Sequence, residues 1–152
     1  MVKPIPDGYE AVTPYLIVDG AAAALEFYKG AFGAEEVHRI ETGDGRIGHA
    51  EIRIGKGMVM LADPFPEIGA AAPEPGAAVP VSLTFYCADV DALVVRALRL
   101  GAQLRGEIED KFYGDRMASL LDPFGHTWHV ATHIEDVAPD ELARRAKAAI
   151  GG

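Results

Sequence analysis

The sequence has a single cysteine, a shortage of basic residues and no long apolar run. Cys87, being alone, excludes an internal disulfide and any metal site built only from cysteines. Lys and Arg total 14 against 23 Asp and Glu, which gives a formal net charge of −9. This acidic balance is the opposite of what binds a phosphate backbone, so we expect no nucleic-acid partner.

Signals for a membrane or for secretion are also missing. No apolar run approaches the roughly 20 residues that cross a bilayer, and no basic stretch followed by an apolar stretch opens the chain. We therefore expect no membrane partner and a cytoplasmic location. Glycine-rich phosphate loops, Ser-His-Asp signatures and paired-cysteine motifs are absent as well, which argues against kinases, hydrolases and zinc fingers.

What the sequence does contain is enough apolar material for a core, since 49% of its 152 residues are hydrophobic. The first half, residues 9–63, predicts a strand over Ala11–Val18 and a helix over Ala21–Phe32, with Asp19 as the N-cap. Apolar side chains recur on one face of that helix, and Gly33 suits the left-handed position after it. Hairpin signals then separate three strands, expected over Glu35–Thr42, Arg46–Ile54 and Met58–Ala62.

Residues 64–80 are expected to be a linker, because residues 70–80 are rich in Ala, Pro and Gly. The second half, residues 81–136, repeats the order of the first. It predicts a strand over Val81–Cys87, a helix capped by Asp89, and strands over Gln103–Glu109, Met117–Leu121 and Thr127–Ile134. Residues 137–152 predict a C-terminal helix in which Pro139 takes the first helical position.

The repeat indicates an α+β fold of two βαβββ modules and a C-terminal helix. Each module presents a sheet face that it cannot bury alone, so we expect the modules to pair into a barrel with a central cavity. The turn Asp122-Pro123-Phe124-Gly125 predicts a hairpin that leads into the last strand. Strand alternation places His129 on the face opposite Trp128, which we expect to pack beneath a helix, so His129 is predicted to face the cavity.

Six segments carry a family resemblance between about Tyr9 and Asp136: Pro14-Tyr15-Leu16, Glu26-Phe27-Tyr28, Ile47-Gly48-His49-Ala50-Glu51, Tyr113-Gly114-Asp115-Arg116, Asp122–Trp128 and Ala131-Thr132-His133-Ile134-Glu135-Asp136. In these segments the chain resembles the vicinal oxygen chelate superfamily, which includes glyoxalase I, bleomycin- and fosfomycin-resistance proteins and extradiol dioxygenases. Within it, the chain looks most like the PhnB-like branch. One fold hosts several chemistries here, so the resemblance implies the fold more firmly than the reaction.

The resemblance also implies a divalent metal, held by residues from the first and last strand of each half. By position these residues are Thr13, Met60, Ser82 and His129. Hydroxyls are poor ligands for zinc, nickel or iron, and a thioether prefers soft ions. We therefore expect no cofactor and no metal site of the usual kind; if a divalent metal (Zn, Ni or Fe) binds, His129 is the expected ligand.

Hydroxyl, aromatic and polar side chains are expected to line the cavity. His49 and Glu51 would lie about 6–7 Å apart on one strand face, where they either share a ligand or ion or form a solvated pair. Arg116 is either in an ion pair with Asp115 or in an anion-binding corner. The expected ligand-binding residues are Thr13, Tyr15, His49, Glu51, Met60, Ser82, Thr84, Tyr86, Arg116 and His129, with His129 also the candidate catalytic acid–base group.

Three functions follow as hypotheses. The leading one is a homodimeric protein that binds a small organic ligand without the usual metal site. A lyase, isomerase or dioxygenase that recruits a divalent metal through His129 with His49 or Glu51 is the first alternative. The second alternative is a resistance protein that sequesters a drug.

Overall fold

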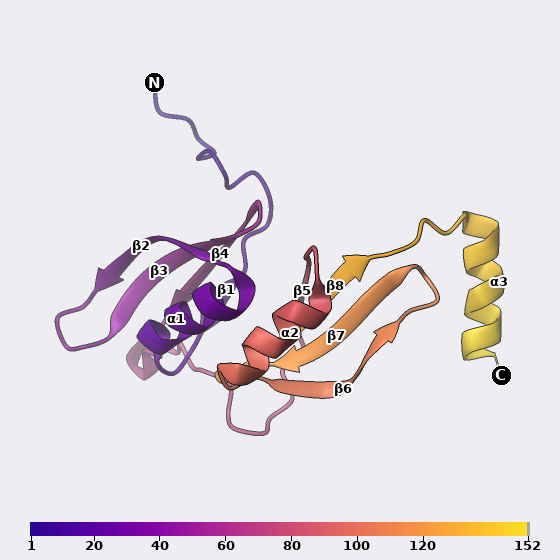
Figure 1. Cartoon of the computed structure of the whole chain (residues 1–152). Coiled ribbons are helices and arrows are strands. Elements are labelled where there is room, and N and C mark those ends of the chain that lie inside the picture. The colour runs from indigo at the N-terminus through magenta and orange to yellow at the C-terminus, as the bar shows by residue number, and fades with distance from the viewer. Residues whose placement is uncertain (152) are drawn as a thin grey trace. The chain divides into compact units, whose positions relative to one another are not determined.

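The computed structural model describes residues 1–151, and these residues form two compact units. The first unit is Met1–Ala78 together with Pro123–Gly125, and the second is Val79–Asp122 together with the chain from His126 onward. Each unit contains a four-stranded sheet with a helix along it (Figure 1). Each is described below by itself.

The first unit contains one long helix and four strands in βαβββ order. These are β1 (Tyr15–Ile17), α1 (Ala21–Phe32), β2 (Glu35–Glu41), β3 (Ile47–Ile54) and β4 (Gly57–Ala62), followed by a single 3₁₀ turn over Pro66–Ile68. The strand order is β1-β4-β3-β2, with β1 parallel to β4 and the other pairs antiparallel.

The second unit repeats this topology. It contains β5 (Ser82–Tyr86), α2 (Val90–Arg99), β6 (Gln103–Asp110), β7 (Asp115–Leu121) and β8 (Thr127–His133), and then α3 (Pro139–Ile150). The order β5-β8-β7-β6 matches the first sheet strand for strand, and β5 is again parallel to β8. The predicted α+β class, the βαβββ order of both halves and the C-terminal helix are confirmed.

The start of the first module differs from the expectation in two ways. The strand predicted over Ala11–Val18 is limited to Tyr15–Ile17, because Pro14 has no N–H to give to a ladder and only its carbonyl pairs, with the N–H of Met60. Asp19 is not the N-cap: Gly20 holds that position in a left-handed conformation, with no side-chain cap of its own among the described residues. The cap comes from Asp63 at the end of β4, whose Oδ1 accepts from the N–H of Ala21 at 2.8 Å.

Apolar side chains occupy the helix side of each sheet. Leu16, Ala50 and Leu61 lie opposite one another across the first sheet and are buried, as are the residues of α1 that were predicted to face the core. In the second sheet Trp128 and Val130 are buried, as expected for the side of β8 that packs beneath α2. The opposite face of each sheet is therefore the one left for polar side chains.

Helix α3 begins at Pro139, as predicted, and none of its described residues is buried. Arg145 attaches it to the second unit through Glu135, at 2.8 and 2.9 Å, and through the carbonyl oxygen of Phe112 at 3.1 Å. Among residues 1–151, no helix is long and apolar enough to span a membrane.

Candidate functional site

A row of polar side chains crosses the first sheet on the face opposite α1. Strand register places Tyr15 of β1 beside Met60 of β4, Met60 beside Glu51 of β3, and Glu51 beside His38 of β2. His49, two residues before Glu51, lies on the same face. The row thus has members from all four strands of the sheet, and it includes four of the predicted ligand-binding residues, Tyr15, His49, Glu51 and Met60.

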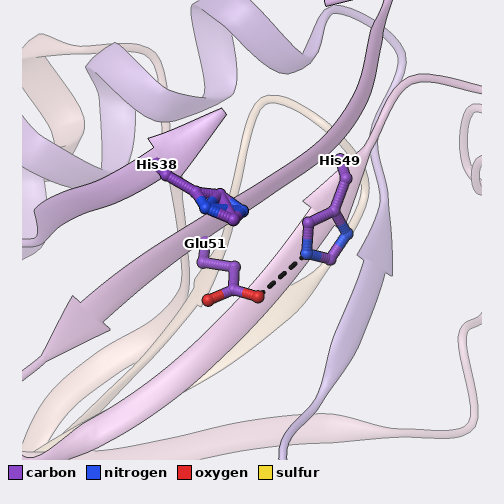
Figure 2. Close-up of side chains that lie close together, drawn as sticks. All are labelled: His38, His49 and Glu51. Carbon is purple, nitrogen blue, oxygen red and sulfur yellow. Dashed lines mark hydrogen bonds and ion pairs between the residues drawn. The ribbon is translucent and has the colours of Figure 1, made fainter. Parts of the chain in front are cut away.

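Hydrogen bonds connect this row into a chain. The Nε2 atom of His49 lies 2.9 Å from Oε1 of Glu51, and its Nδ1 atom lies 2.8 Å from the hydroxyl of Tyr15. Tyr9, from the segment before β1, donates a hydrogen bond to Oε2 of Glu51. Figure 2 shows the side chain of His38, from the neighbouring strand, beside His49 and Glu51. The predicted pairing of His49 with Glu51 is therefore direct.

The surroundings of Glu51 hold it in the ionised form. Burial acts to raise the pKa of this carboxyl, but the hydrogen bonds from His49 and Tyr9 and the nearby imidazoles outweigh burial, and the pKa lies below its ordinary value. The pKa of Tyr9 is raised, mainly by its hydrogen bond to Glu51, and that of Tyr15 is raised by burial. Both tyrosines thus keep their protons at neutral pH and remain hydrogen-bond donors.

His38 is the member of the cluster that the sequence interpretation missed. Counting back from the Gly43–Gly45 turn without irregularities places His38 opposite Ala50, on the helix side of the sheet. The observed ladder shifts between Ile40 and Glu41, so His38 lies opposite Glu51 instead. Gly48, inside the partner strand at this point, is the available signal, since a glycine within a strand often marks a bulge.

The second sheet carries a row at the equivalent positions. Thr84 of β5 lies beside His129 of β8, His129 beside Ser119 of β7, and Ser119 beside Arg105 of β6. The hydroxyl of Ser119 lies 2.8 Å from Nδ1 of His129. His129 thus occupies, in its own sheet, the place that Met60 has in the first.

Other predicted residues have partners that favour structural roles. Arg116 is paired with Asp91 of α2, at 2.7 and 2.9 Å, and with Asp110 at 2.8 Å, rather than with Asp115. Asp115 is buried and lies 2.6 Å from the hydroxyl of Tyr86 and 2.8 Å from Nδ1 of His133. Thr13 lies before β1, outside the paired register, and Ser82 is exposed beside Thr127 at the start of β5.

The residues at the first and last strands of the modules do not suit a hard or borderline metal ion. In the observed registers these strands offer Tyr15, Met60, Thr84 and His129, or Thr13 and Ser82 in the neighbouring places. Only His129 in this set is a good ligand for zinc, nickel or iron. The better donor set, two imidazoles and a carboxylate, lies on β2 and β3, where the donor atoms of His38, His49 and Glu51 are within 4.8 Å of one another.

Solved structures show where this fold has been seen before. A gene product from Arabidopsis thaliana matches with a TM-score of 0.66 at 23% identity, covering 81% of this chain and 98% of that chain. A variant of the fosfomycin resistance protein FosX from Listeria monocytogenes, in complex with Mn(II) and 1S,2S-dihydroxypropylphosphonic acid, matches with a TM-score of 0.63 at 16% identity, covering 89% and 97%. At these identities the likeness concerns the fold alone.

Sequence comparisons establish the family. An uncharacterised protein of Mycobacterium bovis is 38% identical over 135 residues, which cover 87% of this chain and 89% of the relative. Residues 10–130 match the model of the Glyoxalase/Bleomycin resistance protein/Dioxygenase superfamily, as the vicinal oxygen chelate resemblance implied. The chain therefore belongs to the glyoxalase/bleomycin resistance protein/dioxygenase superfamily.

Proposed function

We propose that this protein binds a small organic ligand on the polar face of the first sheet, as a member of the PhnB-like branch of its superfamily. The observation that carries the proposal is the chain of hydrogen bonds through Tyr9, Glu51, His49 and Tyr15. It holds polar side chains in fixed orientations on a sheet face, and a few convergent polar groups beside aromatic surface are typical of ligand sites.

The side chains of the row indicate what kind of ligand fits. The rings of Tyr15 and His49 lie with their centroids 5.4 Å apart, and Met60 adds an adaptable apolar contact beside them. Ionised Glu51 accepts hydrogen bonds and donates none. We therefore propose a ligand with a flat apolar part and at least one hydroxyl, amide or amine donor.

A thermal-shift screen tests this function. The panel contains aromatic antibiotics, small ketoaldehydes and fosfomycin, each at a concentration well above micromolar. A ligand at about 100 times its Kd stabilises the folded state by about 2.7 kcal/mol. For a chain of this size that corresponds to a rise in Tm of about 5–10 °C.

Two conservative variants locate the site. Tyr15→Phe and Glu51→Gln each remove one polar group from the row, and both are expected to reduce the ligand-dependent shift. Tyr113→Phe is the matched control, since its hydroxyl contacts Met117 in the second unit. The proposal fails if no compound raises Tm, or if Tyr15→Phe and Glu51→Gln respond to the active compound as the unsubstituted protein does.

We also propose that the protein acts as a homodimer. Helix α3 supports this, because its apolar side chains are left uncovered by the chain's own described residues: Ile150 is 78% exposed and Leu142 is only half-buried. A second copy of the chain would cover them.

A further inference from the structure

We propose that His38, His49 and Glu51 form a binding site for a divalent transition-metal ion, with zinc the best-suited ion. The site lies on β2 and β3 of the first sheet, and none of its three ligands comes from the first and last strands from which the resemblance implied metal ligands. It does not depend on the small organic ligand of the proposed function.

The donor set is the first support. Two imidazole nitrogens and a carboxylate oxygen are common protein ligands of zinc, and the same set suits nickel and iron. Donors around tetrahedral zinc lie about 3.4 Å apart, given metal–ligand bonds of about 2.0–2.2 Å. In the structure the three donor atoms lie within 4.8 Å of one another, and His49 Nε2 and Glu51 Oε1 are 2.9 Å apart. Small side-chain rotations therefore bring all three to bonding distance.

The second support is that hydrogen bonds from outside the cluster already orient two of the three ligands. Tyr15 bonds Nδ1 of His49, which leaves Nε2 as the nitrogen that faces the cluster. Tyr9 bonds Oε2 of Glu51, which leaves Oε1 on the side of His49. When Nε2 binds a metal, the imidazole proton is on Nδ1, and Nδ1 then donates to the hydroxyl oxygen of Tyr15. Metal-binding histidines and carboxylates are commonly held in orientation by such outer hydrogen bonds.

The two modules give an internal comparison. At the places of Glu51 and His38, the second sheet has Ser119 and Arg105. A hydroxyl is a weak ligand and a guanidinium cation repels a metal ion. The repeated topology thus creates equivalent positions twice, but only the first module fills them with metal-binding groups.

The number of ligands indicates the type of site. Three protein ligands leave at least one coordination position for water or for an oxygen of a bound molecule, as in catalytic rather than structural zinc sites. His38 is exposed on the edge strand β2, so an ion reaches the cluster without rearrangement of the core.

Metal titration of the purified, chelator-treated protein tests the site. Zinc binding is measured by calorimetry, and Co²⁺ is added as a spectroscopic probe whose visible absorption reports nitrogen and oxygen ligation. We expect one ion per chain. His38→Ala should weaken zinc binding at least about 100-fold, and Tyr15→Phe should weaken it about 10–100-fold, the usual cost of losing an outer-shell partner.

Three further variants make the result decisive. His126→Gln removes a histidine outside the cluster and should leave zinc affinity unchanged. His129→Ala tests the position that the resemblance favours. His38→Gln is a second substitution for the event that His38→Ala perturbs folding, which circular dichroism and Tm would reveal.

The proposal is overturned by any of three results: no zinc binding at micromolar concentration, zinc binding that survives loss of His38, or zinc binding that is lost in His129→Ala. None of these results bears on a metal-independent thermal shift by a small organic ligand. Failure of the metal site and failure of the proposed function are therefore distinguishable.

Discussion

Asp63 binds three backbone N–H groups from two distant parts of the first module. Its Oδ1 accepts from Gly20 at 3.1 Å and Ala21 at 2.8 Å, and its Oδ2 accepts from Ile47 at 2.7 Å. One buried carboxylate thus caps helix α1 and connects the helix start to β3. The first turn of a helix has N–H groups without helical partners, so a buried anion there is strongly stabilising.

Substitution of Asp63 is expected to destabilise the protein substantially. Asp63→Ala leaves buried N–H groups unpaired and should lower the free energy of unfolding by about 2–4 kcal/mol. Asp19→Ala is the matched control, because Asp19 is exposed and makes no side-chain cap; its effect should stay within about 0.5 kcal/mol. Urea unfolding measures both. Equal effects of the two substitutions would contradict the assignment of the cap to Asp63.

His133 gives the stability of the protein a specific pH dependence. Its hydrogen bonds to Asp115 and Asp136 raise the pKa of the imidazole above its ordinary value of 6.5. Its contribution is therefore complete below about pH 6.5 and is lost as the pH rises through the raised pKa. The hydrogen bonds from Tyr86 and His133 lower the pKa of Asp115 below 3.8, so that contribution is present above this pH and is lost on acidification through the lowered pKa.

The hydrogen bonds of His133 with Asp115 and Asp136 should thus stabilise the fold most between about pH 4 and pH 6.5. We expect the difference in Tm between the unsubstituted protein and His133→Gln to be largest near pH 5–6 and to shrink towards pH 9. Asp136→Asn, which removes the exposed partner, should show the same trend with a smaller difference. A difference in Tm that stays constant from pH 5 to pH 9 would count against protonation of His133 as the cause.

At the level of elements, the irregular pairing of β2 with β3 decides the composition of the candidate site. The register shifts between Ile40 and Glu41 and again between Glu36 and His38. The first shift moves His38 to the face of Glu51, and the second returns Glu36 to the helix side, where it pairs with Lys29 of α1 at 2.8 Å. Residues two apart on a regular strand share a face, but these two one-residue bulges place His38 and Glu36 on opposite faces of the sheet.

Gly48 is expected to be required for the first of these shifts. A Cβ atom at Gly48 would lie 2.8 Å from Cγ2 of Thr42, closer than side-chain carbons approach each other. Gly48→Ala should therefore cost about 1–3 kcal/mol of unfolding free energy, as overpacking does.

The partner variant Thr42→Ser removes that methyl group and keeps the hydroxyl. In the double variant the cost of Gly48→Ala should fall by more than half, which a double-mutant cycle in urea measures. Strict additivity of the two substitutions would contradict a steric origin.

The same elements show how far sequence alone reaches. The buried face of α1, the left-handed Gly33 and the hairpin turns depend on local spacing, and all were predicted correctly. Asp63 as the cap of α1, and Asp91 as a partner of Arg116, depend on which distant segments meet, and local patterns carry no such information. The position of His38 depends on local sequence and on the bulge. A regular strand predicts the wrong face for it, because a bulge reverses the face of every residue beyond it.

For the whole molecule, we expect a homodimer formed with the help of α3. Light scattering at micromolar concentration should give twice the 16.2 kDa chain mass. The double variant Leu142→Glu/Ile150→Asp, which places charges on the uncovered side chains of α3, should shift the mass to that of the monomer. Val12→Asp, at an exposed site far from α3 in sequence, is the control and should remain dimeric. A monomeric mass for the unsubstituted protein would refute the expectation.

The parallel pairing of β1 with β4 also bears on the order of events during synthesis. Within residues 1–151, strand β1 pairs with β4 alone, and β4 is the last strand of its module to leave the ribosome. The backbone groups of the three residues of β1 therefore have no strand partner until synthesis has reached Ala62. Such non-local closure slows folding, because the chain pays loop entropy before the contact forms. An unpaired strand can pair with another chain and cause aggregation. Because β1 is so short, it offers few backbone groups for such pairing.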